Sequence, residues 1–293
     1  MTTDAFQRNR DNFCYRHPDR QSFVLCQRCM RTICPECQTQ AAVGVVCPEC
    51  LKAQQQMQSP AQKKAERRWS RQPRAVAVSD TRPLVTYAII GITALFYLIA
   101  LIPGIGDQVS AMLGFIAPAL YPELSGVFQP WRLFTVALVH SGLWHLGLNM
   151  VALWLIGRSL EPLLGRWRFL TLYLLGTLGG SVAVALLSFL TPVVGASGAI
   201  FGLFGALLVI GRHIGANITG IAIILGINLV IGFVPGFNVS WQAHVGGLVT
   251  GALVGFIFTR TRSPKRRMLQ IWLLVAVAAG LIGLLFVPPI LYW

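Results

Sequence analysis

Seven long apolar runs constrain this chain more than any other feature of its sequence. They cover residues at about 84–103, 132–156, 168–190, 196–212, 217–235, 242–259 and 269–290. A helix needs about 20 residues to cross the hydrocarbon core of a bilayer, so each run is a candidate membrane span. Because 55% of the 293 residues are hydrophobic and only 12% are charged, a soluble domain is excluded. The sequence predicts an all-α polytopic membrane protein.

The basic residues between the runs predict the direction of each span. The net charge is +14, but it collects in the first 82 residues and in short loops, which favours a membrane protein over one that binds nucleic acid. One alternating set of flanks holds the segment before residue 83, then Arg158, Arg166, Arg168, Arg212, Arg260, Arg262, Lys265, Arg266 and Arg267. The other set holds only Arg132. In a plasma (inner) membrane, the positive-inside rule then predicts a cytoplasmic N-terminus and an extracytoplasmic C-terminus.

All seven cysteines lie before Lys52, and with one histidine they form four pairs of the same spacing. The pairs are Cys14 with His17, Cys26 with Cys29, Cys34 with Cys37, and Cys47 with Cys50. Two intervening residues let a tight turn aim both side chains at one ion, and eight ligands fill two tetrahedral zinc sites. An odd number of cysteines argues against a closed set of disulfides. We therefore expect two structural zinc ions, with no coordination position left for hydrolytic chemistry.

Few apolar residues separate these pairs, so metal binding must supply much of the module's folding free energy. The order of the pairs over residues 14–50 resembles a B-box-type zinc finger, with Cys47 and Cys50 where that family usually ends in histidines. The resemblance implies a cross-braced arrangement, in which Cys14, His17, Cys34 and Cys37 hold one ion and Cys26, Cys29, Cys47 and Cys50 hold the other. Sequential pairing is the alternative. A closed module of this kind suits binding or regulation, including recruitment of a cytosolic partner protein.

The chain divides by composition into four segments. We expect a zinc-binding module at 1–52, a flexible basic linker at 53–82, a core of six spans at 83–260, and a basic loop with a seventh span at 261–293. The basic end of the linker is expected to lie against anionic lipid headgroups. The loop at about 104–131 is so apolar that it is expected to lie partly within the membrane, packed on protein, rather than as an amphipathic surface loop.

Polar and ionisable side chains inside membrane spans are costly and mark candidate functional sites. Ser197 opens the fourth span within Gly195-Ala196-Ser197-Gly198. Such a motif is either a small-residue packing surface or a nucleophilic serine on a tight turn. The remaining polar groups of this kind are His140, His145 and Asn149 in the second span and His244 in the sixth. We expect all five groups at a similar depth, in the outer half of the bilayer.

Glycines provide the means of bringing Ser197 to His244. The sixth span carries Gly247, Gly251 and Gly255 at four-residue spacing, and the fourth carries Gly198, Gly202 and Gly205. Two such faces pack backbone to backbone, which predicts a hydrogen bond between the serine and the histidine. In this Ser–His dyad, His244 takes the proton from Ser197. His145, Asn149 and the Ser197 backbone N–H then stabilise the oxyanion.

Three motifs together resemble the rhomboid family of intramembrane serine proteases. They begin at His140, Gly195 and Ala243 and read HSGLWHLGLN, GASG and AHVGGLVTG. The resemblance covers residues 84–259 and implies the same roles for Ser197, His244, His145 and Asn149, with a seventh span added to six. It further implies supporting roles for His140, for Arg132 in a Trp-Arg motif of the first loop, and for Glu161. Phe201 stands where many relatives have a tyrosine, so its contact with the catalytic histidine must be packing alone.

The predicted function is that of a serine endopeptidase that cleaves transmembrane segments of other proteins and needs no cofactor for the chemistry. The alternative is a catalytically silent membrane adaptor that binds transmembrane clients and recruits a cytosolic partner through the zinc module. A transporter or channel is disfavoured because the spans hold no carboxylates for ion coupling and show no inverted repeat.

Overall fold

The computed structural model describes residues 9–41, 44–57, 59, 82–231 and 239–292. The chain divides into two units, Met1–Ser79 and Asp80–Trp293. Most of the predicted linker, residues 60–81, lies outside the described residues. Helix α2 (Pro48–Gln56) starts inside the cysteine-rich module and continues past residue 52, where the sequence predicts that the module ends.

The first unit is small and irregular. It contains η1 (Arg10–Asn12), η2 (Pro35–Cys37), α2 and an antiparallel pair of short strands, β1 (Thr39–Gln40) and β2 (Val45–Val46). Its buried core holds five cysteines with only Ile33 and Val46 as fully apolar members. So small a core cannot offset the entropy of ordering the chain, as expected for a module that folds around metal.

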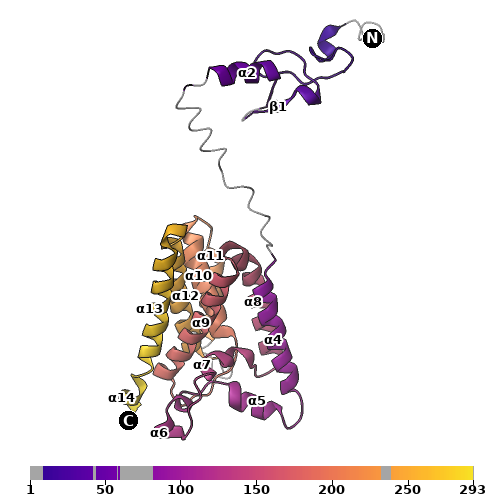
Figure 1. Ribbon diagram of the computed structural model, residues 1–293. Helices are drawn as coiled ribbons and strands as arrows, with labels where there is room; N and C mark the ends of the chain where they lie inside the picture. Colours follow the sequence, from indigo (N-terminus) through magenta and orange to yellow (C-terminus); the bar gives the residue numbers. More distant parts are fainter. Residues whose placement is uncertain (1–8, 42–43, 58, 60–81, 232–238, 293) are drawn as a thin grey trace. The chain divides into compact units, whose positions relative to one another are not determined.

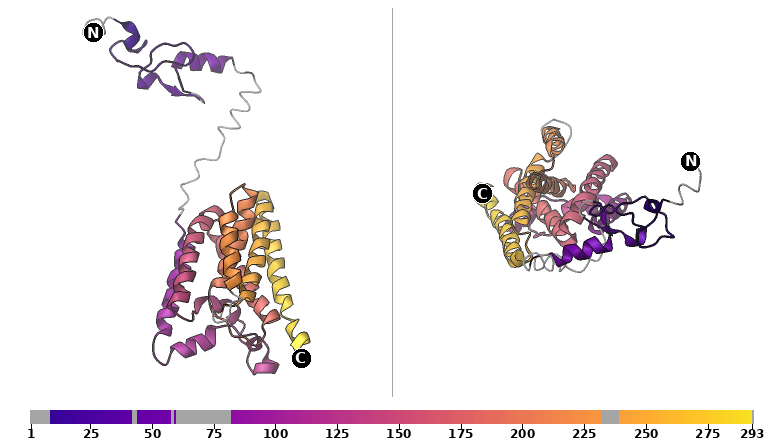
Figure 2. Two further views of the ribbon diagram at one scale, coloured as in Figure 1. Left: turned by 180° about the vertical axis from the view of Figure 1, so that it is seen from behind. Right: turned by 90° about the horizontal axis from the view of Figure 1, so that it is seen from above.

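The second unit is a bundle of helices (Figures 1 and 2), which confirms the predicted all-α membrane fold. Its long helices are α4 (Leu84–Ala100), α8 (Leu143–Leu164), α9 (Arg166–Leu187), α10 (Ser197–His213), α11 (Thr219–Ile231), α12 (Trp241–Arg260) and α13 (Arg267–Leu284). In the described part of the chain, α9, α12 and the run Pro264–Leu291 are long and apolar enough to cross a membrane on their own. Helices α4, α10 and α11 are apolar but shorter.

The second predicted span is corrected by the structure. Residues 132–156 do not form one helix: α7 (Arg132–Thr135) and η4 (Val136–Leu138) are followed by a break, and α8 begins at Leu143 at an angle of 98° to them. The break contains His140, Ser141 and Gly142, but apolar residues precede and follow it, so the whole run has the composition of a single span. His140 therefore lies between η4 and α8, outside both, and α8 itself runs on to Leu164.

Helices α9, α10 and α12 form the centre of the bundle because glycines let their backbones touch. A Cβ on Gly247 would collide with the carbonyl of Gly198, and one on Gly251 would collide with the carbonyl of Gly202. Gly198 meets Gly247, and Gly202, four residues later, meets Gly251, so α10 and α12 run in the same direction. Gly180 meets the Cα of Gly198 from α9. The predicted glycine faces are thus the actual contact surfaces.

The segment between α4 and α7 packs on the bundle through its backbone and one deeply buried ring. It contains α5 (Gly106–Leu113), η3 (Ala117–Leu120) and α6 (Pro122–Ser125). Three side chains at α7 donate to carbonyls at the end of α5: Trp131 to Met112 (3.1 Å), Arg132 to Gly114 (2.8 Å) and Thr135 to Leu113 (2.8 Å). Phe115 is fully buried. Through its bond to Gly114, Arg132 helps to hold this segment against α7.

Helix α4 is held by a buried carboxylate on α8. Glu161 is 2% exposed, and it accepts hydrogen bonds from the backbone N–H groups of Val85 (2.9 Å) and Thr86 (2.8 Å) and from the Thr86 hydroxyl (2.7 Å). The first N–H groups of a helix lack partners within the helix, and a negative charge there is favoured by the helix dipole. Glu161 therefore caps α4 from a neighbouring helix.

The helices outside the centre are less buried. On α13, Gln270 is the buried residue; it accepts from Arg168 on α9 and donates to Thr261 after α12. At the other end of the unit, the Tyr121 hydroxyl donates to the Leu285 carbonyl (2.6 Å). Helix α11 stands at the margin of the bundle (Figure 2), with Leu225 buried among its described side chains.

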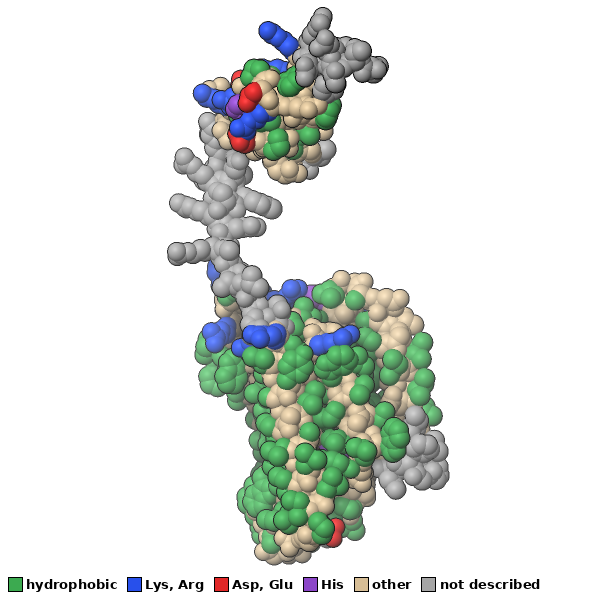
Figure 3. All heavy atoms as spheres, turned by 90° about the vertical axis from the view of Figure 1, so that its right-hand side faces the viewer, with side chains coloured by type: hydrophobic (Ala, Val, Ile, Leu, Met, Phe, Trp, Pro, Cys, Tyr) green, Lys and Arg blue, Asp and Glu red, His purple; other side chains and the backbone are tan. Residues whose placement is uncertain are grey.

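Charge is distributed unevenly along the helical unit. Lys and Arg side chains gather at one end, and hydrophobic side chains cover the flank (Figure 3). The helix ends that carry Arg166, Arg212, Arg260 and Arg267 belong to α9, α10, α12 and α13. A basic end above an apolar flank is the surface expected of a multi-pass membrane protein.

Candidate active site

Ser197 is the first residue of α10 and follows a turn that is held on both sides. The loop before it pairs with the α5–η3 segment through reciprocal backbone bonds between Val193 and Phe115 (2.9 and 2.8 Å). The Gly195 N–H donates to the Val136 carbonyl at 3.0 Å. Gly195 has a φ of +123°, a conformation that side chains disfavour. The turn therefore presents a half-buried Ser197 at a fixed position beside the break that precedes α8.

His244 lies on the first turn of α12, buried against α10. Its ring stacks on the ring of Phe201, with centroids 4.0 Å apart and planes at 12°. Phe201 is one helical turn after Ser197, so the stack holds the imidazole against the serine-bearing end of α10. Both Ser197 and His244 are described, and no hydrogen bond joins them in this conformation; the predicted dyad bond stays a prediction.

His145 faces the same turn from α8. A Cβ built on Gly195 would lie 2.7 Å from His145 Nε2, so the imidazole nitrogen occupies the space a side chain would need. The opposite ring nitrogen, Nδ1, is 3.0 Å from the hydroxyl of Ser141. Glycine is required at position 195 for two reasons: the backbone has a positive φ, and the His145 ring fills the space of a side chain.

Asn149 lies one turn after His145 on α8 and is buried. One N–H of its amide donates to the His145 carbonyl at 2.8 Å. The amide carries a second N–H, which is available to another acceptor. The predicted pairing of His145 and Asn149 on one helical face is thus present in the structure.

His140 supports the serine turn rather than facing it as a second base. The Ala196 N–H approaches His140 Nε2 at 3.4 Å, and the His140 and His145 rings meet edge to face with centroids 5.0 Å apart. His140 therefore connects the break before α8 to the residue next to Ser197. Glu161, in contrast, lies at the N-terminus of α4, where it caps that helix.

The convergent groups define which chemistry is available. An alcohol, three imidazoles and an amide come from α10, α12, α8 and the break between η4 and α8. Residues 83–293 contain only three acidic side chains, Asp107, Glu123 and Glu161, and none lies on α10 or α12. The set therefore suits nucleophilic attack by an alcohol with imidazole as base, in a dyad without a carboxylate. Sequence reasoning missed Ser141, whose four-residue spacing from His145 was the available signal.

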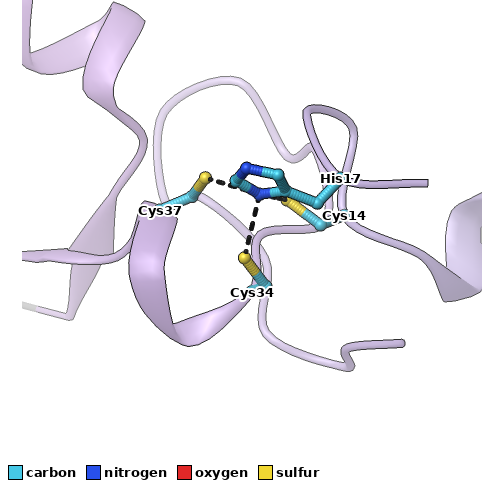
Figure 4. A group of neighbouring side chains, drawn as sticks. All are labelled: Cys14, His17, Cys34 and Cys37. Carbon is cyan, nitrogen blue, oxygen red and sulfur yellow. Dashed lines mark hydrogen bonds between the residues drawn. The ribbon is translucent and has the colours of Figure 1, made fainter. Parts of the chain in front are cut away.

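The cysteines and His17 of the first unit gather into two groups of four. Within each group, the ligand atoms all lie within 4.8 Å of one another: Cys14, His17, Cys34 and Cys37 in one, and Cys26, Cys29, Cys47 and Cys50 in the other. Figure 4 shows the sulfurs of the first group around the His17 ring. The grouping is the one that the cross-braced arrangement predicts, and the sequential alternative does not describe it.

The spacing within these groups fits a tetrahedral metal ion. The distances from His17 Nδ1 to the sulfurs of Cys34, Cys37 and Cys14 are 3.3, 3.5 and 3.8 Å. Tetrahedral zinc bonds to nitrogen and sulfur place such atoms about 3.6 Å apart. In the second group, the Cys29 and Cys47 sulfurs are 3.7 Å apart, against about 3.8 Å for two zinc-bound sulfurs. Both groups can hold a dication, and closed sets of this kind supply folding energy rather than catalysis.

The pKa values of the thiols indicate how readily neighbouring cysteines ionise together without a metal ion. Burial raises the pKa of Cys14, but hydrogen bonds from backbone N–H groups, first that of Cys34, outweigh this and lower it to about 6. Burial raises the pKa of Cys37 to about 11, with the neighbouring Cys14 sulfur adding to the rise. Several thiolates are therefore disfavoured side by side, and a dication in their midst relieves that repulsion.

Comparison with known proteins identifies the helical unit. The family model described as "Rhomboid domain" matches residues 127–261. The chain belongs to the rhomboid family. The matched rhomboid segment spans the break, α8, α9, α10, α11 and α12, and so includes every residue of the convergent group. The resemblance drawn from the three motifs is confirmed.

Named relatives agree with this membership. The chain is 34% identical over 220 residues to "Rhomboid protease GluP" of Bacillus subtilis (strain 168), covering 72% of this chain and 42% of the relative. It is 39% identical over 138 residues to "RHOMBOID-like protein 1" of Arabidopsis thaliana, covering 44% of this chain and 35% of the relative. To the human "Rhomboid-related protein 3" it is 28% identical over 173 residues, 52% of this chain and 42% of that protein. The chain thus spans less than half the length of each of these relatives.

Proposed function

We propose that this protein is an intramembrane serine endopeptidase with Ser197 as nucleophile and His244 as base. The observation that supports this proposal is that two imidazoles converge on the N-terminal end of α10, where Ser197 lies. The Phe201 stack holds His244 against the turn of α10 that follows Ser197, and His145 Nε2 faces the turn that precedes it. A packing motif alone needs no imidazole on either side of its serine. Membership of a family with a named protease agrees with this function.

The proposed reaction follows from these positions. Rotation of the Ser197 side chain forms its hydrogen bond to His244, as catalytic hydrogen bonds tighten when substrate binds. The serine oxygen attacks the scissile carbonyl while His244 takes the proton, which it later gives to the leaving amine. The Ser197 backbone N–H, His145 and the second N–H of Asn149 bind the oxyanion. Phe201 offers its ring face only, so it positions His244 by packing.

The substrates are proposed to be transmembrane proteins. A fully hydrogen-bonded helix hides its carbonyls, so segments with a small residue at the cut and a helix that unwinds readily are the expected targets.

The uneven distribution of basic residues supports a cytoplasmic N-terminus and an extracytoplasmic C-terminus in the plasma (inner) membrane. The two metal groups are proposed to hold zinc in a structural role. A reporter enzyme active only outside the cytoplasm, fused after Trp293, tests the orientation; activity is expected, and its absence contradicts the assignment.

Proteolysis of a model transmembrane substrate by the purified full chain tests the function. Cleavage is expected in the wild type and in Ser125→Ala, which removes a hydroxyl at the end of α6, remote from Ser197 in the chain. It is expected to vanish in Ser197→Ala and in His244→Ala. Removal of zinc by a chelator is expected to leave at least part of the activity. Cleavage that persists in Ser197→Ala excludes the proposed nucleophile.

Labelling with a fluorophosphonate probe separates the enzyme from the alternative adaptor. A probe signal that depends on Ser197 shows an activated alcohol, which an adaptor has no need for. The adaptor instead predicts normal cellular function in Ser197→Ala and loss of function in Cys26→Ser, because only the zinc module recruits the cytosolic partner. Absence of labelling together with that pattern of phenotypes favours the adaptor.

A further inference from the structure

We propose that Ser141 is a positioning residue of the active site, which orients His145 so that Nε2 points at the serine turn. The inference deepens the proposed function and rests on it. Ser141 lies in the break before α8, and its hydroxyl is 3.0 Å from His145 Nδ1. The other ring nitrogen of His145 occupies the space beside Gly195. The hydroxyl therefore holds the ring by the end that faces away from the reaction.

The contact matters because it influences which ring nitrogen of His145 carries the proton. To bind an oxyanion, a neutral His145 must donate from Nε2, and its Nδ1 must then be an acceptor. Ser141 is a suitable partner because its hydroxyl donates to Nδ1 in that tautomer. If the ring becomes protonated, the same hydroxyl accepts from Nδ1–H. A hydroxyl is thus compatible with both forms that place a proton on Nε2, whereas an alanine leaves the ring free to rotate.

The backbone gives Ser141 a fixed position. It is followed by Gly142, the residue before α8, and the Gly142 carbonyl accepts from the Leu146 N–H at 2.9 Å. On its other side, His140 is tied to Ala196. The residues on both sides of Ser141 are therefore bound to the elements that carry His145 and Ser197, so the hydroxyl needs little reorganisation to reach Nδ1.

The first test compares variants of the full chain in detergent or bilayers. Ser141→Ala is expected to lower kcat about tenfold with KM nearly unchanged, because the loss falls on oxyanion binding and not on substrate binding. Ser141→Thr keeps the hydroxyl and is expected to recover most of the rate. Ser125→Ala, which loses a hydroxyl in the α6 turn, is the matched control and should cleave at the wild-type rate.

A double-mutant cycle separates positioning from a general effect on folding. If Ser141 acts through His145, Ser141→Ala has little further effect on the rate of fluorophosphonate labelling in a His145→Ala background. If it acts on folding, the two losses multiply. The ¹⁵N resonances of the His145 ring give a readout without activity: Ser141→Ala should change the proton distribution between Nδ1 and Nε2.

The outcomes distinguish this inference from the function on which it rests. A wild type without any Ser197-dependent cleavage or labelling defeats the proposed function. A wild type that is active, with Ser141→Ala equally active and the His145 resonances unmoved, defeats the role of Ser141 alone. Multiplicative losses in the cycle also overturn it.

Discussion

Gly195 shows how one residue sets the geometry of the candidate site. Its φ of +123° lets the chain turn sharply into α10, and its missing side chain leaves room for the His145 ring. Either requirement alone excludes most residues. Together they tie the position of the nucleophile to the position of an oxyanion group, so the two cannot be altered independently.

We therefore expect Gly195→Ala to reduce cleavage at least about 100-fold while the protein still folds, because a methyl group displaces His145 and strains the turn. Rates of substrate cleavage and of fluorophosphonate labelling measure the effect, with the melting temperature as the check on folding. The control is Gly126→Ala, which also has a positive φ (+69°), in the left-handed helical region, but open space around it. Equal activity in the two variants would contradict the proposed crowding.

At the scale of the helices, the glycine faces are the feature that the sequence predicted best. Gly198, Gly202, Gly247 and Gly251 recur at the helical period, and the periodicity alone identifies the α10–α12 contact. The 98° break before α8 was not predictable in this way, because residues on both sides of it are equally apolar. Ser141 lies in that break and not in α8, so its four-residue spacing from His145 could not by itself establish the contact between them.

Gly251→Leu is expected to destabilise the bundle strongly, by about 3 kcal/mol or more, because its side chain would have to enter the backbone of α10 at Gly202. Unfolding in mixed detergent measures the loss. Gly280→Leu places the same side chain on α13, where no neighbouring atom lies within 4 Å, and serves as its control. A stable Gly251→Leu protein would show that the close backbone contact is absent.

Glu161→Gln tests the cap on α4. The carboxylate oxygens accept from Val85, from Thr86 and from its hydroxyl, and an amide replaces one acceptor with a donor that faces an N–H. We expect a loss of about 2 kcal/mol in unfolding free energy and faster hydrogen exchange at the first turn of α4. Exchange that stays unchanged there would exclude the cap.

At the scale of the whole chain, two units with different folding principles are joined. The helical unit is stabilised by backbone packing, whereas the first unit has almost no apolar core outside its cysteines. Ligand spacing is local, so the sequence predicted the four pairs of ligands. The grouping of those pairs into two sets came from the resemblance to a B-box-type zinc finger. The role of the module depends on a partner surface that spacing does not encode.

Elemental analysis of the purified chain is expected to give two zinc ions per molecule, and His17→Ala or Cys26→Ser is expected to lower that number. Chelation should make the first unit sensitive to protease because metal supplies its folding energy. The helical unit should keep its melting temperature, since none of its described side chains belongs to either metal group. Loss of helix stability on chelation would contradict the independence of the units.

The direct backbone contacts among α9, α10 and α12 have a mechanical consequence. Where carbonyl oxygens rest on Cα atoms, no side chain is present that can change rotamer to absorb a displacement. These three helices therefore move as a rigid block. Any opening that admits a transmembrane segment of a substrate must come from the elements around them. Helix α11, which has few buried side chains, offers the least resistance to such a displacement.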